Sequence, residues 1–164
     1  MLLLCLACTQ DTKPAQNQVA ATSTVEATAG KNYLSMKVNG VEWKADNEIF
    51  GAFHPKGYNK AIIIAGLKGK KGQNEQIFNL NLYNTDGPNT YTFADGNPDY
   101  NVAQFMNIAP GNDICGSGMG FKMKAIVTKA SGLPNEIEAT FEGEMTCGNN
   151  EVLKITEGKF YFHE

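Results

Sequence analysis

The chain has 164 residues, of which 42% are hydrophobic and 10% aromatic, and its formal net charge at pH 7 is −3. This length fits one domain with a tail, and the hydrophobic fraction is sufficient for a packed core. The charge excludes a strongly basic surface of the kind that binds DNA or RNA, so we expect no nucleic-acid partner. The 17 glycines and the short apolar runs favour an all-β domain with many turns.

The N-terminus has the pattern of a secretory signal. A short apolar run ends in the small residue Ala7, which is followed by Cys8. Leu6-Ala7-Cys8 resembles the lipobox of bacterial lipoproteins, in which the cysteine receives lipid and becomes the first residue after cleavage. The pattern departs from the lipobox at Cys5, where leucine is usual, and it lacks a basic n-region. We expect residues 1–7 to be a signal peptide; an unprocessed apolar N-terminus is the alternative.

Lipid on Cys8 makes the membrane the first expected partner. No other apolar stretch approaches the roughly 20 residues of a transmembrane helix, so the protein would be anchored rather than spanning. Residues 8–32 hold no aromatic side chain and cannot bury enough surface to offset the entropy of ordering them. We therefore predict a disordered tether over residues 8–32 and a single β domain over residues 33–164.

The most strongly indicated hairpin turns at Asn39-Gly40, which separates two alternating segments. A two-residue turn places three apolar pairs on one face of the hairpin. These pairs are Leu34 with Ala45, Met36 with Trp43, and Val38 with Val41. Lys37 falls opposite Glu42 on the other face, where opposite charges attract. We predict that Trp43, the only tryptophan, is a core residue rather than an exposed platform for sugar stacking.

The middle of the chain predicts further short strands. They are Ile49–Phe53, Ala61–Leu67, Gln76–Tyr83, Thr90–Phe93, Val102–Ile108 and Phe121–Val127. Ala61–Leu67 is a continuous apolar run, which predicts a strand covered on both sides. Val102–Ile108 is interpreted as a short strand or an irregular edge. No segment sustains an apolar stripe with the helical period of 3.6 residues.

The C-terminal region predicts a long hairpin. Apolar and polar residues alternate from Asn135 to Met145, which is typical of a strand with one buried and one wet face. The wet face carries glutamates that we interpret as solvated rather than catalytic, namely Glu136, Glu138, Glu142 and Glu144. In the second strand the apolar phase changes at Glu157-Gly158. We predict a β-bulge with Gly158 in the left-handed conformation; a tight turn between two shorter strands is the alternative.

About nine or ten short strands at this spacing predict an antiparallel β-sandwich. The alternative fold is a meander β-barrel of lipocalin type. It requires an interior cavity, and the side chains expected to line that cavity are Phe78, Leu80, Phe141 and Phe160.

A disulfide is the one covalent cross-link that the sequence predicts. Once the two N-terminal cysteines are removed or lipidated, Cys115 and Cys147 remain. Two registers of the hairpin that turns at residues 131–134 pair apolar with apolar residues, and they place Ser117 or Met119 opposite Cys147. Export to an oxidising compartment favours a Cys115–Cys147 bond, which would stabilise the fold by roughly 3–4 kcal/mol. Two free buried thiols are the alternative, and no Cys or His lies near either at metal-ligand spacing.

One loop offers oxygen atoms at alternate positions, as a calcium loop does. These belong to Asp95, Asn97 and Asp99. Tyr100 stands where such a loop needs glycine, and Met106 where it needs a bidentate glutamate. We therefore favour an Asx-rich turn and keep calcium only as a weak alternative. No other metal and no cofactor is predicted.

Nothing in the chain forms a recognisable catalytic motif. Gly116-Ser117-Gly118 does not satisfy the nucleophile-elbow pattern, and no helix is predicted after it. His54 and His163 are the only histidines, and neither has a sequence neighbour that would make it a general base. No phosphate-binding glycine loop is present. We expect the protein not to be an enzyme.

Several motifs follow one another in a recognisable order, and those after the tether cover most of residues 33–162. They are the lipobox and polar tether, the early Val-Asn-Gly-Val-Glu-Trp-Lys-Ala, the middle Gly-Pro-Asn-Thr-Tyr-Thr-Phe, and the late Ala-Thr-Phe-Glu-Gly and Ile-Thr-Glu-Gly-Lys-Phe. This order resembles a family of small uncharacterised lipoproteins of Bacteroidota. The resemblance implies an all-β lipoprotein of the outer membrane or cell surface, and its motifs carry no activity over to this chain.

The sequence thus predicts a lipid-anchored module of the bacterial cell envelope that binds an envelope protein or a small ligand without catalysis. One rival is a carrier of a small apolar ligand, which needs the interior cavity. The other is a hydrolase, which needs a cleft that joins His54 to a nucleophile and an acid.

Overall fold

The computed structural model describes residues 31–54, 60–109 and 112–164, and all the regular elements in them are β-strands. The predicted signal peptide, Cys8 and residues 9–30 of the predicted tether lie outside the described residues. The strands are β1 (Tyr33–Val38), β2 (Val41–Lys44), β3 (Asn47–His54), β4 (Ala61–Lys68), β5 (Gln76–Leu82), β6 (Asn89–Ala94), β7 (Val102–Ala109), β8 (Asn112–Gly116), β9 (Phe121–Gly132), β10 (Asn135–Thr146) and β11 (Val152–His163).

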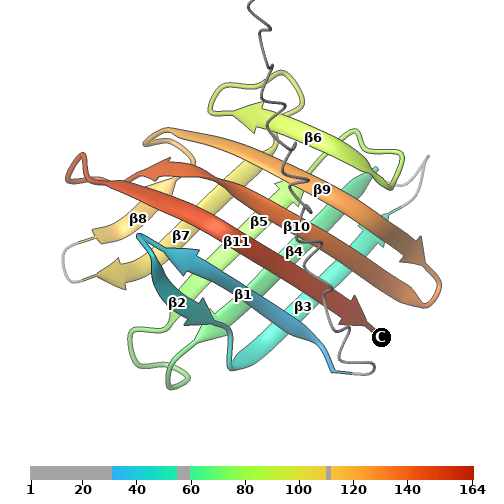
Figure 1. The fold of residues 1–164 in the computed structure, drawn as a ribbon, viewed down its shortest axis with the longest axis horizontal. Helices are drawn as coiled ribbons and strands as arrows, with labels where there is room; N and C mark the ends of the chain where they lie inside the picture. The colour runs from blue at the N-terminus through green and yellow to red at the C-terminus, as the bar shows by residue number, and fades with distance from the viewer. Residues whose placement is uncertain (1–30, 55–59, 110–111) are drawn as a thin grey trace, which may run out of the picture.

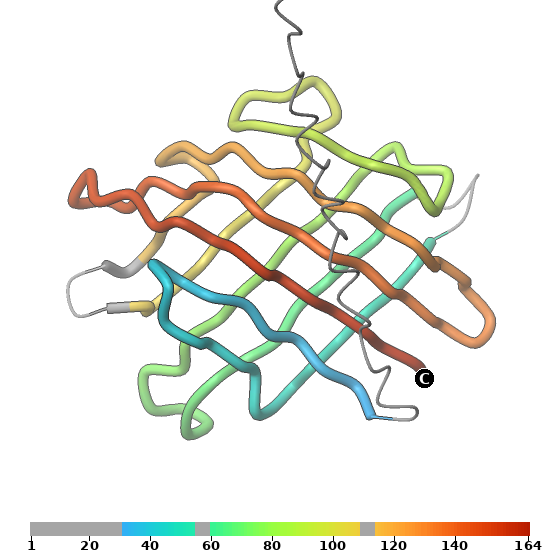
Figure 2. Tube along the Cα trace, in the orientation of Figure 1, coloured from blue at the N-terminus to red at the C-terminus, as the bar shows by residue number. Residues whose placement is uncertain are grey.

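The strands form two antiparallel sheets. One has six strands in the order β2-β1-β11-β10-β9-β6, and the other has five in the order β3-β4-β5-β7-β8. Figure 1 shows the six-stranded sheet in front of the five-stranded one, with their strands crossing steeply, and Figure 2 follows the same path along the chain. The predicted sandwich is confirmed, and the sheets are not closed into the alternative barrel.

The structure has more strands than the nine or ten that the sequence predicts, because the sequence pattern does not predict β8. β8 is short, and it lies beside glycines that are typical of a loop. Its presence also changes the place of β7, which is an inner strand between β5 and β8 rather than an irregular edge. The segment predicted as Val102–Ile108 therefore has paired neighbours on both sides.

The first hairpin has the predicted register. Met36 pairs with Trp43 and Val38 with Val41, and Trp43 is only 3% exposed, as predicted for a core residue. Val41 departs from the prediction, since 71% of it is exposed at the start of the edge strand β2. Lys37 lies opposite Glu42 as predicted, but its ammonium forms its ion pair with Glu157 of β11 at 2.7 Å.

The second strand of the C-terminal hairpin contains the predicted bulge. Phe141 pairs with Gly158, but Gly143 pairs with Ile155, so β11 holds one residue more than β10 over this interval. β11 continues through this point, which rules out the tight turn. The prediction for the glycine was wrong in one respect: the left-handed residue is Glu157, with φ of 54°.

Gly158 is required by packing rather than by backbone conformation. A Cβ atom at this position would lie 2.4 Å from both the Phe141 carbonyl oxygen and a carbon of the Phe141 ring. The ring therefore rests directly on the β11 backbone.

The core between the sheets is filled by aromatic and aliphatic side chains. The Phe78 ring of β5 stacks on the Phe141 ring of β10 with centroids 5.1 Å apart, and Trp43 meets Phe105 edge-on at 5.1 Å. The barrel alternative requires a cavity lined by Phe78, Leu80, Phe141 and Phe160. All four side chains are buried. They belong to one continuous core cluster instead.

We predict that Gly158→Ala lowers the free energy of unfolding by about 1–3 kcal/mol, because the new methyl group overlaps the Phe141 backbone and ring. Urea denaturation measures the change. Gly148→Ala is the matched control: a Cβ there meets no atom within 4 Å, so we expect a change within about 0.5 kcal/mol. Equal effects of the two substitutions would contradict the packing role of Gly158.

Candidate functional site

The predicted disulfide is present and joins the two sheets. Cys115 lies near the end of β8 and Cys147 directly after β10; both are buried, and their Cα atoms are 3.9 Å apart. Met145 pairs with Phe121. This is the predicted register in which Met119 would lie opposite Cys147 if the two strands continued. The turn between Gly116 and Gly120 then brings Cys115 rather than Met119 beside Cys147.

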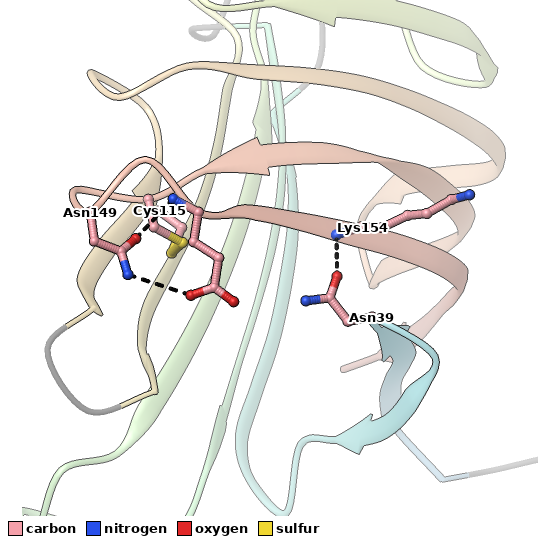
Figure 3. The surroundings of a disulfide bond; sticks show 6 residues. Asn39, Cys115, Asn149 and Lys154 are labelled. Atoms are coloured by element: carbon pink, nitrogen blue, oxygen red, sulfur yellow. Dashed lines mark hydrogen bonds between the residues drawn. A yellow bond between two sulfur atoms is a disulfide. The ribbon is translucent and has the colours of Figure 1, made fainter.

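Backbone hydrogen bonds hold the chain on both sides of this cross-link. Gly148 N donates to Ile114 O at 3.2 Å, and Cys147 N donates to Glu151 O at 2.8 Å. Figure 3 shows the disulfide beside the turn that carries Asn149. Because both cysteines are buried and these neighbours are backbone groups, we assign the disulfide a structural role.

We predict that the Cys115→Ala/Cys147→Ala double variant unfolds with a free energy roughly 3–4 kcal/mol lower than the natural chain, because the bond closes a loop with a sequence separation of 32. Urea denaturation with and without a thiol reductant measures this. The reductant should destabilise the natural chain by a similar amount and leave the double variant unchanged. An identical midpoint for the natural chain and the double variant would refute the stabilising role.

The residues considered for catalysis lie far apart. His54 ends β3 at one edge of the five-stranded sheet, and Ser117 follows β8 at the other edge. Four strand spacings separate these edges, a distance of about 19 Å. His163 pairs with Glu136 at one end of the β10–β11 hairpin. Ser117 lies beyond the opposite end of β10, on the order of 35 Å away by strand rise.

The glutamates of β10 stand on the wet face, as predicted. Glu136 forms an ion pair with Lys129 at 2.7 Å, and the hydrogen bond that the Lys129 ammonium donates lowers the pKa of the Glu136 carboxyl below its usual value. Glu138, Glu142 and Glu144 are exposed. A pair of carboxylates that work together needs one of them to retain a proton, and a carboxyl held ionised by lysine is unsuited to that task.

The loop considered for calcium is organised by hydrogen bonds within the protein. Asn97 Oδ1 accepts from Asn101 N at 2.9 Å, and Asp99 Oδ1 accepts from Asn84 Nδ2 at 3.0 Å. Asp95 Oδ1 accepts from Gly118 N at 3.4 Å. The three side chains thus have different partners, which fits the Asx-rich turn. Within the described ranges, no group of three or more His, Cys, Asp or Glu side chains could hold a metal ion.

The two sheets present outer faces of opposite character. On the six-stranded sheet, the outward positions form what we call the charged face, with Lys37, Glu42, Lys44, Lys122, Lys124, Glu136, Glu138, Glu142, Glu144, Lys154 and Lys159. Lysines of β9 and β11 flank the glutamates of β10 in register, for example Lys122 and Lys154 on either side of Glu144. Such alternation is typical of a solvated surface.

A groove of about 910 Å³ lies beside β2, at the edge of this charged face. Lys44, Ser35 and Lys159 form one row across β2, β1 and β11. The lining also contains acidic side chains, including Glu42 and Glu157, which balance most of the lysine charge. The groove therefore has no strong preference for an anion or a cation.

Across the middle of the five-stranded sheet, the described outward side chains carry no such charges. Because Phe78, Leu80 and Leu82 of β5 point into the core, the alternate residues of that strand point outward. The register extends this assignment across the sheet. It defines the uncharged face as Phe50, Ala52, Ile63, Ala65, Leu67, Ile77, Asn79, Asn81, Val102, Gln104, Met106 and Ile114. None of these side chains ionises, and His54 borders the set.

The uncharged face remains partly accessible. Phe50 is 49% exposed, and ten of the others are half-buried. Each described strand belongs to one of the two sheets, and the sheets pack through a shared core on their inner sides, so no described strand covers this face. Ala61–Leu67 was predicted to be covered on both sides. That prediction was wrong for the described part of the chain: Ile62 and Ile64 face the core, whereas Ile63 and Leu67 face outward.

Three amide side chains occupy the middle of the uncharged face. Asn79 of β5 pairs in register with Gln104 of β7, and Asn81 pairs with Val102. Within the described residues, none of the three amides has a hydrogen-bond partner, and Asn81 Oδ1 is buried without one. The amides of Asn79 and Gln104 therefore offer unused donors and acceptors among aliphatic side chains, whereas Asn81 Oδ1 is itself buried. The signal in the sequence was the unbroken apolar run of β4, combined with the asparagines that alternate along β5.

The described residues contain no helix with the length and hydrophobicity needed to cross a membrane. Comparisons with family models, with curated proteins and with solved structures gave no match to this chain.

Proposed function

We propose that the protein is a lipid-anchored lipoprotein of the bacterial cell envelope, in the outer membrane, that acts as a non-enzymatic interaction module. The lipobox at Cys8 and the resemblance to Bacteroidota lipoproteins support the anchor. The uncharged face supports the interaction role, and it is the observation that carries the proposal. A contiguous accessible apolar surface on a folded domain is more often a binding site than a surface that contacts only solvent.

The shape of this face favours a protein partner over a small molecule. Small ligands are held in concave sites that bury most of their surface, whereas the uncharged face is the outer side of an open sheet. Its aliphatic side chains suit the apolar part of a protein interface, and its amides can supply the hydrogen bonds that such interfaces contain.

The described residues give less support to the two rival functions. A carrier needs an interior cavity, but Phe78, Phe141 and the residues around them form a filled core. A hydrolase needs a base beside a nucleophile, but His54 and Ser117 lie at opposite edges of one sheet.

The anchor predicts a specific intact mass for protein extracted from membranes. We expect the chain to begin at Cys8 and to carry three acyl chains, since stable anchoring takes more than one. Thiol reductant should add the mass of two hydrogen atoms as the Cys115–Cys147 bond opens. A Cys8→Ser variant is the control and should lose the acyl mass. An unmodified chain that retains residues 1–7 would refute the anchor.

The interaction role predicts cross-linking from one face only. A photo-reactive phenylalanine analogue at Met106, on the uncharged face, should form covalent protein adducts in intact cells. The same analogue at Ile126 is the matched control, because Ile126 is an exposed apolar residue on the outer side of the six-stranded sheet. We expect adducts at Met106 and none at Ile126. Equal yields, or no adduct at Met106, would contradict the proposed function.

A further inference from the structure

The composition of the uncharged face indicates the kind of partner that it fits. Interfaces between two identical subunits are more apolar than those of transient complexes, which resemble the rest of the protein surface. Ile63, Leu67, Ile77, Met106 and Ile114 dominate this face, and none of its side chains is Lys, Arg, Asp or Glu. The face thus has the composition of a subunit interface.

We propose that the partner of the uncharged face is a second copy of this chain, related to the first by a two-fold axis. The inference rests on the proposed function, because it names the occupant of the same surface. In a two-fold interface the same patch meets itself, so the patch must be complementary to its own chemistry. A face with one dominant sign of charge repels its copy, whereas a neutral face does not.

The amides provide this self-complementarity. Each Asn or Gln side chain can both donate and accept a hydrogen bond. Asn79 lies on β5, the middle strand of the five-stranded sheet, with Gln104 directly beside it on β7. A two-fold axis close to Asn79 would bring the amides of the two copies together at the centre of the contact. The aliphatic side chains would then surround these hydrogen bonds and exclude water.

The size of the face sets the strength of the dimer. Five strands at about 4.8 Å spacing, with outward residues about 7 Å apart along each strand, give a footprint on the order of 500 Å² per copy. Stable complexes bury about 800 Å² per partner. We therefore expect a reversible dimer with a dissociation constant in the micromolar range or weaker. Confinement to a membrane surface would raise the effective concentration of the two copies.

The test is sedimentation velocity of the full chain carrying Cys8→Ser, which removes the lipid, at concentrations from about 1 to 500 μM, chosen to span the weak end of protein complexes. The weight-average mass should rise from that of one chain towards that of two. Ile63→Lys should abolish this rise, because it places a charge on the face. Ile126→Lys, the matched control on the opposite side of the sandwich, should retain the curve of the parent chain.

The urea midpoint of the Ile63→Lys variant reports whether it folds. If it does not fold, a second variant provides the test. Asn79→Asp changes the amide to a carboxylate of the same shape and should weaken the dimer at least about tenfold at neutral pH by like-charge repulsion across the axis. A single-chain mass at every concentration would overturn the proposal. So would equal weakening by Ile63→Lys and Ile126→Lys.

The cross-linking experiment separates this inference from the proposed function. Adducts at Met106 with the mass of two chains support both. Adducts with another protein, together with a monomer in sedimentation, overturn the dimer and leave the interaction role standing. Absence of both adducts and dimer overturns both proposals.

Discussion

The contact between Phe78 and Phe141 is the interaction on which the rest of the fold depends. It joins the middle of the five-stranded sheet to β10 of the six-stranded sheet through stacked rings. Because successive residues of a strand alternate between faces, placing these two rings in the core, together with the phase changes at the bulges, determines which residues of the paired strands point outward. The charged face and the uncharged face are both consequences of that assignment. Gly158 belongs to the same arrangement, since the Phe141 ring occupies the space of a side chain there.

Sequence patterns predicted the parts of this fold in which local chemistry and alternation agree. Asn39-Gly40 defined the first hairpin and its register, and the phase change near Gly158 located the bulge. The reason for the glycine was out of reach, because it depends on a ring that is close only after β10 and β11 pair. β8 was missed for a similar reason: its hydrogen bonds come from β7, and its short sequence has little preference of its own.

The candidate site was less predictable than the fold. The unbroken apolar run of β4 was recognised, but a continuous run cannot say whether the second side is covered by the same chain or by another. Asn79 and Gln104 are separated in the chain by the whole of β6, which belongs to the other sheet, and by the loops on either side of it, so their pairing is visible only in the structure. The disulfide was predictable by elimination among four cysteines. The residue that lies opposite Cys147 was not predictable, because it depends on the turn between Gly116 and Gly120.

The covalent loop between Cys115 and Cys147 also affects how the domain responds to proteolysis. It encloses the whole of β9 and β10, including the hairpin turn in which Leu133 is 96% exposed. A protease that cuts at this turn would produce two fragments, each with one half of the cystine. The fragments would stay joined through sulfur and would also remain paired in the sheet. Nicked protein would therefore migrate as an intact chain until a reducing agent separates it, which gives the domain tolerance to cleavage at this exposed turn.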